Sequence, residues 1–192
     1  DLDADRSLAL QADGSYRESL YPTPGLENTA AAYDAWQDSL TLQSPVIINE
    51  VLVSDPNGEF SSYDGSDWVE LKNISSSIVS LVGWYLSDNN DNYKKSSLPA
   101  AALAPGEVTV VRCDQLGLSL NAENDAIFLY HNETGLQDWL PLRDIPYGGS
   151  YGRAPGRNGA FFFPSASPNE ENRNGKRRVS ATPTALSPDG IF

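Results

Sequence analysis

The stretch Asp67-Trp-Val-Glu-Leu-Lys-Asn73 alternates along its length, with Trp68, Glu70 and Lys72 on one side and a valine and a leucine on the other. Successive side chains of a β-strand point to opposite faces of its sheet, so this period of two predicts a strand. The aliphatic side predicts contact with a hydrophobic core. The stretch therefore favours a layered β structure.

Short strand patterns lie on both sides of this stretch, and turn signals such as Pro105-Gly106 and Asn132–Gly135 separate them. We expect further strands at residues 46–53, 78–79, 81–86, 107–112, 125–130, 139–142, 150–153 and 160–163. About seven to eight short strands with frequent turns and almost no helix predict an all-β sandwich. Trp84, which follows Gly83 on an apolar strand, is the expected central core aromatic, and Trp68 is the second expected structural core residue.

Composition excludes several classes of function. The 192 residues include one Cys, one His and 26 acidic against 13 basic residues, for a formal net charge of −13. A single Cys excludes an internal disulfide and multi-cysteine metal sites. The negative charge opposes phosphate neutralisation, so nucleic acid is not an expected partner. No apolar run is long enough to span a membrane.

Two hairpin-like segments recur about one domain length apart. Each has a strand, an Asx-Gly turn, a second strand and a Pro/Asn stop. The matched pairs, at offsets of 143 or 144 residues, are Ser7 with Ser150, Pro24 with Pro168 and Asn28 with Asn172. Such an offset indicates that residues 1–28 are the closing hairpin of a preceding repeat, with chance similarity as the alternative. We expect this hairpin either to dock on the main sandwich through Tyr16, Tyr21 and the helix of Trp36, or to swap onto another chain.

Residues 29–44 predict a short connector helix, because they are rich in alanine and carry an apolar stripe near helical spacing. Thr29 is the expected N-cap of this helix. Residues 153–192 are basic, with Arg173, Lys176, Arg177 and Arg178 clustered, which predicts a solvated linker, with a grip on an acidic partner as the alternative.

The order of four motifs resembles the lamin-tail domain of the bacterial secreted or surface type. The motifs are Trp68–Asn73, Leu81–Asp88, Leu103–Val110 and Asn124–Gly135. The resemblance covers about residues 45–172 and implies an immunoglobulin-like β-sandwich. The last residues are similar to the opening strand of a following β domain, so residues 173–192 are expected to hold a basic linker and the start of that domain.

The resemblance implies a non-catalytic, extracellular or cell-surface module that binds, spaces or attaches a larger protein. A protein or other cell-surface component is then the expected partner. The alternative is an accessory carbohydrate-binding domain of a secreted hydrolase. Exposed aromatic residues outside the core, with Tyr63, Tyr93 and Tyr147 as candidates, would favour carbohydrate.

Three patterns that suggest catalysis have simpler interpretations. Gly148–Gly152 fits a serine-hydrolase elbow, but no His follows it, and a turn followed by an edge strand is expected instead. Cys113 with His131 fits a thiolate–imidazole pair, but a small buried thiol and a surface His are expected. Glu70 beside Trp68 fits a raised-pKa acid, but a hydrogen-bonded structural carboxylate is expected. We predict no cofactor.

Calcium is the metal that the sequence suggests. Asp88, Asn90 and Asn92 have the first spacings of a calcium loop, although its sixth and twelfth positions do not fit. The predicted ligands are Asp88, Asn90, Asp91, Asp64 and Asp67, provided that the two loops meet at one end of the sandwich. The alternative is an Asx-rich turn that satisfies its own backbone.

Overall fold

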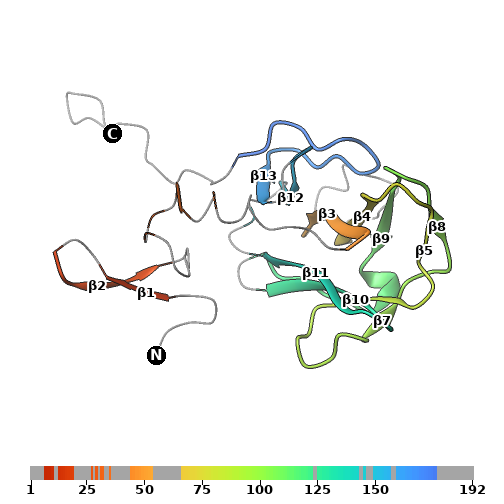
Figure 1. The fold of residues 1–192 in the computed structure, drawn as a ribbon, viewed down its shortest axis with the longest axis horizontal. Helices are drawn as coiled ribbons and strands as arrows, with labels where there is room; N and C mark the ends of the chain where they lie inside the picture. Colours follow the sequence, from red (N-terminus) through yellow and green to blue (C-terminus); the bar gives the residue numbers. More distant parts are fainter. Residues whose placement is uncertain are drawn as a thin grey trace.

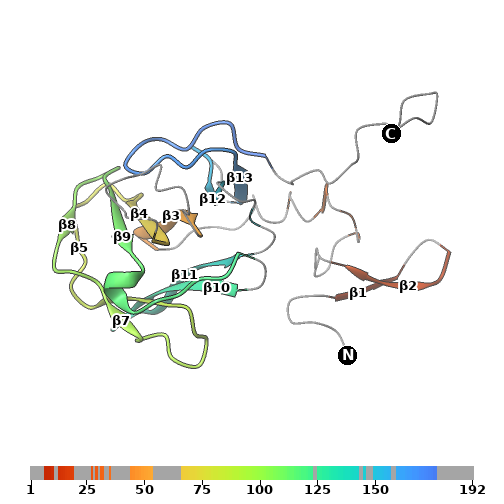
Figure 2. The ribbon, with the colours of Figure 1, turned by 180° about the vertical axis from the view of Figure 1, so that it is seen from behind.

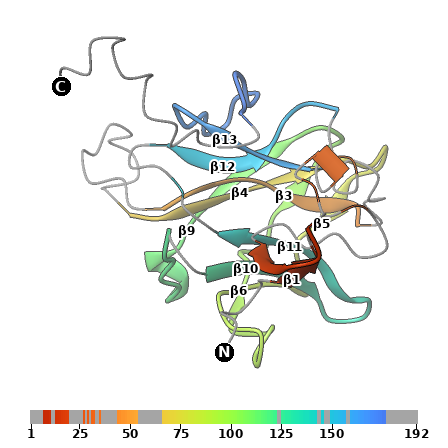
Figure 3. The same ribbon diagram turned by 90° about the vertical axis from the view of Figure 1, so that its left-hand side faces the viewer.

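Two antiparallel sheets form the body of the protein and face each other (Figures 1 and 3). The computed structural model describes residues 7–10, 13–19, 27, 29, 31–32, 35, 44–53, 66–122, 125–142, 145, 149–156 and 159–176. The first sheet has the order β13-β12-β3-β4-β9, from β3 (Val46–Leu52), β4 (Trp68–Asn73), β9 (Val108–Arg112), β12 (Ser150–Arg153) and β13 (Ala160–Phe163).

The second sheet has the order β11-β10-β6-β7, from β6 (Trp84–Ser87), β7 (Ser96–Ser97), β10 (Asp125–His131) and β11 (Gly135–Leu142). Two separate pairs complete the described strands: β5 (Val79–Ser80) with β8 (Ala102–Leu103), and β1 (Ser7–Leu10) with β2 (Tyr16–Ser19). A 3-10 helix, η2 (Asp114–Leu116), follows β9. Among the helices of the described residues, none is long and apolar enough to cross a membrane.

The predicted immunoglobulin-like β-sandwich is confirmed, and individual strands differ in detail. Gly83 has φ of +84° and ends a turn, so the tryptophan strand begins at Trp84 and not at Leu81. The strand expected at 139–142 begins at Gly135. The expected edge strand at 150–153 is wrong, because β12 lies between β13 and β3. Strands β7 and β8 have two residues each, too few for an alternating pattern to reveal them.

The main hydrophobic core lies between the two sheets. Trp84 is 4% exposed and packs there with Leu71 and Val69 of β4 and Leu129 of β10. Trp68 is fully buried on the other face of the five-stranded sheet, in a smaller cluster with Leu52 and Ala166. The alternation of β4 therefore directs its residues into two separate cores.

The chain after β13 covers the outer face of the five-stranded sheet. A Cβ at Gly175 would approach the Phe163 ring to 2.8 Å, which shows how closely this segment lies against β13. Lys176 then pairs with Phe162 through backbone hydrogen bonds of 2.7 and 2.8 Å. Figure 3 shows this part of the chain on the side of β12 and β13 that faces away from β10 and β11. The start of the predicted basic linker thus extends the sheet, and residues 177–192 lie outside the described residues.

The N-terminal segment contains the predicted hairpin. Strands β1 and β2 pair around a turn in which the Asp13 carboxylate accepts the Ser15 N–H at 2.9 Å. In Figures 1 and 2 the hairpin stands beside the sandwich, and Tyr16 is 66% exposed instead of docked. Tyr21 and Trp36 lie outside the described residues.

The connector is described at a few positions. Ala31, Ala32 and Ala35 are helical, and the Thr29 hydroxyl accepts the Ala32 N–H at 3.1 Å, which is the hydrogen bond of an N-cap. The predicted domain boundaries stay predictions.

The two tryptophans Trp84 and Trp139 provide a matched test of the core. We expect Trp84→Ala to lower the free energy of unfolding by roughly 3–5 kcal/mol, because it opens a cavity between the sheets. Trp139 is 45% exposed, so Trp139→Ala should cost about 1 kcal/mol or less. Equilibrium unfolding in guanidinium measures both values, and an unchanged midpoint for Trp84→Ala would show that it is not a core residue.

Candidate functional site

A group of aromatic side chains lies on the outer face of the four-stranded sheet. Ile127 and Leu129 of β10 point into the core, so the residues that alternate with them point outward. We call the outward group the aromatic row, and it consists of Trp139 of β11, Phe128 and Tyr130 of β10, Tyr85 of β6 and Tyr93 of the β6–β7 loop.

Contacts between rings make the row continuous across three strands. The Phe128 and Trp139 rings are stacked with centroids 6.3 Å apart, as expected for residues directly opposite each other on β10 and β11. The Tyr93 ring lies 5.2 Å from Phe128 and 6.0 Å from Tyr130, and Tyr85 lies 6.5 Å from Tyr130. The Tyr93 ring therefore links Phe128 to Tyr130 within the aromatic row.

The aromatic row is partly open to solvent. Trp139 is 45% exposed and the neighbouring Leu136 is 43% exposed, while the other four rings are half-buried. Lys94 places its ammonium group 5.4 Å from the Tyr130 ring centroid, within the range of a cation–π interaction. Apolar side chains gathered at the surface in this way are typical of an interaction site.

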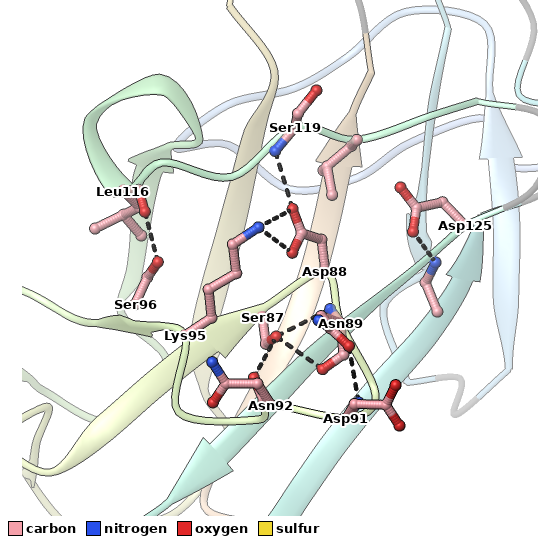
Figure 4. Close-up of polar contacts among 12 residues, drawn as sticks. Ser87, Asp88, Asn89, Asp91, Asn92, Lys95, Ser96, Leu116, Ser119 and Asp125 are labelled. Carbon is pink, nitrogen blue, oxygen red and sulfur yellow. Dashed lines mark hydrogen bonds and ion pairs between the residues drawn. The ribbon is translucent and has the colours of Figure 1, made fainter.

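The β6–β7 loop holds Tyr93 in place through its own polar contacts (Figure 4). The Ser87 hydroxyl donates to the backbone oxygens of Asn92 at 2.8 Å and Asn89 at 3.0 Å, and accepts the Asn89 N–H at 2.9 Å. The Asn89 side chain accepts the Asp91 N–H at 2.8 Å. The Asx-rich turn therefore satisfies its own backbone and fixes the residue that follows it.

Asp88 anchors the same loop to the rest of the sandwich. Its carboxylate accepts hydrogen bonds from Lys95 Nζ at 2.6 and 2.8 Å and from the Ser119 N–H at 3.1 Å. Burial by itself would raise the pKa of Asp88, but these bonds and the Lys95 charge outweigh it and lower the pKa. Asp88 is thus an ionised anchor for the aromatic row.

The two loops proposed for calcium do meet at one end of the sandwich. Asp67 accepts the Leu120 N–H at 3.1 Å, and Asp88 accepts the N–H of the preceding residue, Ser119, so the two carboxylates bind adjacent amides. The cation beside Asp88 is Lys95, and Asp91 and Asn90 are exposed. Within the described residues no group of three or more His, Cys, Asp or Glu could hold a metal, and Asp64 lies outside them. Calcium binding stays a prediction, and thermal unfolding with calcium against chelator tests it.

The three patterns that suggested catalysis have structural roles. Ser150 is fully buried and its hydroxyl donates to Glu50. Burial raises the pKa of the Cys113 thiol well above its usual range, and nearby Asp67 adds to the rise, so the reactive thiolate is disfavoured. His131 contacts Thr134 and the Trp84 ring.

Two buried glutamates bind the segment that follows β13. Glu70 accepts Asn49 Nδ2 and the Asn169 N–H, both at 2.6 Å. Glu50 accepts the Ser167 N–H and hydroxyl at 3.1 Å in addition to the Ser150 hydroxyl. Burial raises the pKa of both carboxyl groups. Their partners are groups of the fold itself.

A pocket of about 250 Å³ opens beside this cluster. Its buried polar lining, from Asn49, Arg153 and Asn172, is hydrogen-bonded within the protein. The buried polar groups of the pocket are therefore used by the fold, and Lys72 and Glu171 are its other charged lining residues. The aromatic row, whose rings fill neither core, is the stronger candidate site.

Sequence reasoning named one member of the aromatic row, Tyr93, and missed the other four. Tyr63 and Tyr147 lie outside the described residues. The available signal was the stretch 125–130, in which the positions that alternate with Ile127 and Leu129 include Phe128 and Tyr130. An outward face normally carries polar residues, so aromatic residues at both positions indicate a surface with a role beyond folding.

The fold places the protein in the class of immunoglobulin-like β-sandwich modules. The model of the lamin tail domain family matches residues 41–143, and a search of curated proteins finds no match. Since the match covers more than half of the chain, the protein belongs to the lamin tail domain family. Domains of this family are typically non-catalytic. The hairpin β12–β13 lies beyond the matched residues, but β12 pairs with β3 and so belongs to the same sandwich.

Glu50 makes the stability of the sandwich depend on pH. Burial, with a smaller contribution from Glu70, raises its pKa from 4.5 to about 7. The folded state then binds the proton more tightly than the unfolded chain does. The free energy of unfolding should therefore fall by about 3 kcal/mol as the pH rises from 4.5 through 7, and Glu70 should act in the same direction.

Denaturant unfolding at a series of pH values measures this slope. Glu50→Gln should reduce the slope, because the amide does not titrate, while the exposed control Glu133→Gln should leave it unchanged. Stability that rises with pH across this window, or an equal slope in Glu50→Gln, would contradict the assignment.

Proposed function

We propose that the protein is a non-catalytic extracellular binding module that attaches a larger protein to a cell-surface component through the aromatic row. The observation that carries this proposal is the continuous contact of five aromatic side chains on an outward sheet face. Trp84, Trp68 and the aliphatic residues supply the two cores, so the outward rings are not needed to fill either one.

The chemistry of the row favours a neutral carbohydrate as the component bound. Tyrosine and tryptophan combine an apolar ring, which packs against the C–H groups of a sugar, with a polar edge that hydrogen-bonds its hydroxyls. Ser97, opposite Tyr85 on β7, adds an exposed hydroxyl at the border. The net charge of −13 opposes acidic polymers. Carbohydrate binding fits these features better than a charged protein partner does.

The proposal agrees with a role as an accessory domain beside a catalytic domain. Such a domain holds an enzyme on its insoluble substrate and needs a binding face but no reactive group. The described serine, cysteine and glutamate candidates are engaged in the fold, which leaves the aromatic row as the feature available for that role.

Binding to neutral polysaccharides tests the function. We expect the protein to sediment with at least one of cellulose, chitin, mannan or starch, and Trp139→Ala and Tyr93→Ala each to weaken that binding by about tenfold or more. Tyr16→Ala is the matched control, because Tyr16 is an exposed aromatic residue outside the row. Each variant is first shown to keep the unfolding midpoint expected for a folded sandwich.

Two further outcomes separate the alternatives. Binding through the rings should persist in 0.5 M salt, about three times physiological ionic strength, because salt screens charges and not apolar contacts. Sedimentation with none of the four polymers, or binding that both substitutions leave unchanged, would exclude the aromatic row as a carbohydrate site. Salt-sensitive binding to a surface protein instead would support the charged-partner alternative.

A further inference from the structure

The N-terminal hairpin has the same architecture as the closing hairpin of the sandwich. β1 and β12 each have four residues and begin at Ser7 and Ser150, 143 residues apart. β2 and β13 also have four residues each and begin at Tyr16 and Ala160, 144 residues apart. In both hairpins the first residue of one strand pairs with the last residue of the other. The sequence repeat is therefore also a repeat of strand bounds and register.

The two hairpins also correspond in their faces. Tyr151 and Phe162 of the closing hairpin pack against the main core, and Ala160 is buried in it. Leu8 stands at the place of Tyr151, Tyr16 at that of Ala160 and Leu10 at that of Arg153, and they are 56%, 66% and 52% exposed. Glu18 stands at the place of Phe162. The face that points into the core in one hairpin therefore carries three exposed apolar residues in the other. A two-stranded hairpin with such a face is marginally stable alone and is typically completed by further strands.

This chain's own sheet is a poor partner for the N-terminal hairpin. Ala9 stands where the closing hairpin has Gly152, and a Cβ at Gly152 would lie 2.2 Å from the Asn49 carbonyl oxygen of β3. Leu10 stands where the closing hairpin has Arg153, which pairs with the buried Asp138. A leucine there would leave that carboxylate buried without its cation. A swap onto an identical second copy is therefore disfavoured.

We propose that residues 7–19 are the closing hairpin of a preceding, non-identical lamin-tail-like sandwich, with Leu8, Leu10 and Tyr16 facing its core. The residues of the hairpin specify two features of that sandwich. The strand beside β1 leaves room for the Ala9 methyl group, and the position equivalent to Asp138 is apolar. Residues 20–45 then connect the two sandwiches, and the modules follow one another as a tandem array.

The test compares the 192-residue chain with the same chain extended toward its N-terminus by about 143 residues of its natural sequence, the repeat offset. We expect the extension to supply a second sandwich and to slow amide exchange in residues 7–19 by at least about 100-fold. Leu8→Asp with Leu10→Asp should unfold the added sandwich and leave the unfolding midpoint of the 192-residue chain unchanged. Arg17→Asp is the control, because Arg17 is exposed on the opposite face of the hairpin.

Three results would overturn the proposal. One is a natural upstream sequence without a lamin-tail-like sandwich, and another is unchanged amide exchange in the extended chain. The third is a lower unfolding midpoint of the 192-residue chain in the Leu8/Leu10 variant, or loss of a dimer formed by that chain. Either form of this third result would mean that the hairpin docks on this sandwich or on an identical copy.

Discussion

The ion pair between Arg153 and Asp138 crosses the sandwich and sets the arrangement of the five-stranded sheet. Both side chains are buried, and two parallel hydrogen bonds of 2.8 and 2.9 Å join the guanidinium of β12 to the carboxylate of β11. The pair also satisfies the backbone of Ile48, whose N–H donates to Asp138 at 2.7 Å and whose carbonyl accepts from Arg153. Two buried charges are costly unless each polar atom is satisfied, so this geometry ties the two sheets and β3 together.

The Ile48 backbone needs side-chain partners because β3 has a bulge there. The register with β4 shifts between Ile48 and Glu50, so Asn49 is an extra residue. The bulge brings the Asn49 carbonyl against Gly152, where no Cβ fits. Glu50, the residue after the bulge, lies on the outer face of the strand, where it binds Ser167. Glu50 and Glu70 then hold the chain after β13 across that face. The five-stranded sheet is consequently covered on both faces, whereas no described segment after β13 crosses the outer face of the four-stranded sheet.

The sequence predicts the parts of this arrangement that depend on local pattern. The alternation at 67–73 gives β4 and its two faces, and the four ordered motifs give the fold. The pattern does not show that Asp138 is buried, because its partner Arg153 lies on another strand. The bulge at Asn49, which leaves the Ile48 backbone to this pair, also has no local signal in the sequence. The burial of Glu50 likewise depends on Ser167, which is 117 residues away. Long-range polar pairing is therefore what sequence reasoning missed.

The position of the aromatic row follows from the same constraint. A binding surface needs side chains that the fold does not already use, and the outer face of the five-stranded sheet is occupied by the segment after β13. The outer face of the four-stranded sheet has no such covering among the described residues, so rings that point outward from β10 and β11 stay accessible. Asp88, which sequence reasoning assigned to calcium, pairs with Lys95 and so helps to fix the loop that places Tyr93 beside Phe128 and Tyr130. The acidic loop thus serves the aromatic surface through an internal cation, and a bound metal is not required for that role.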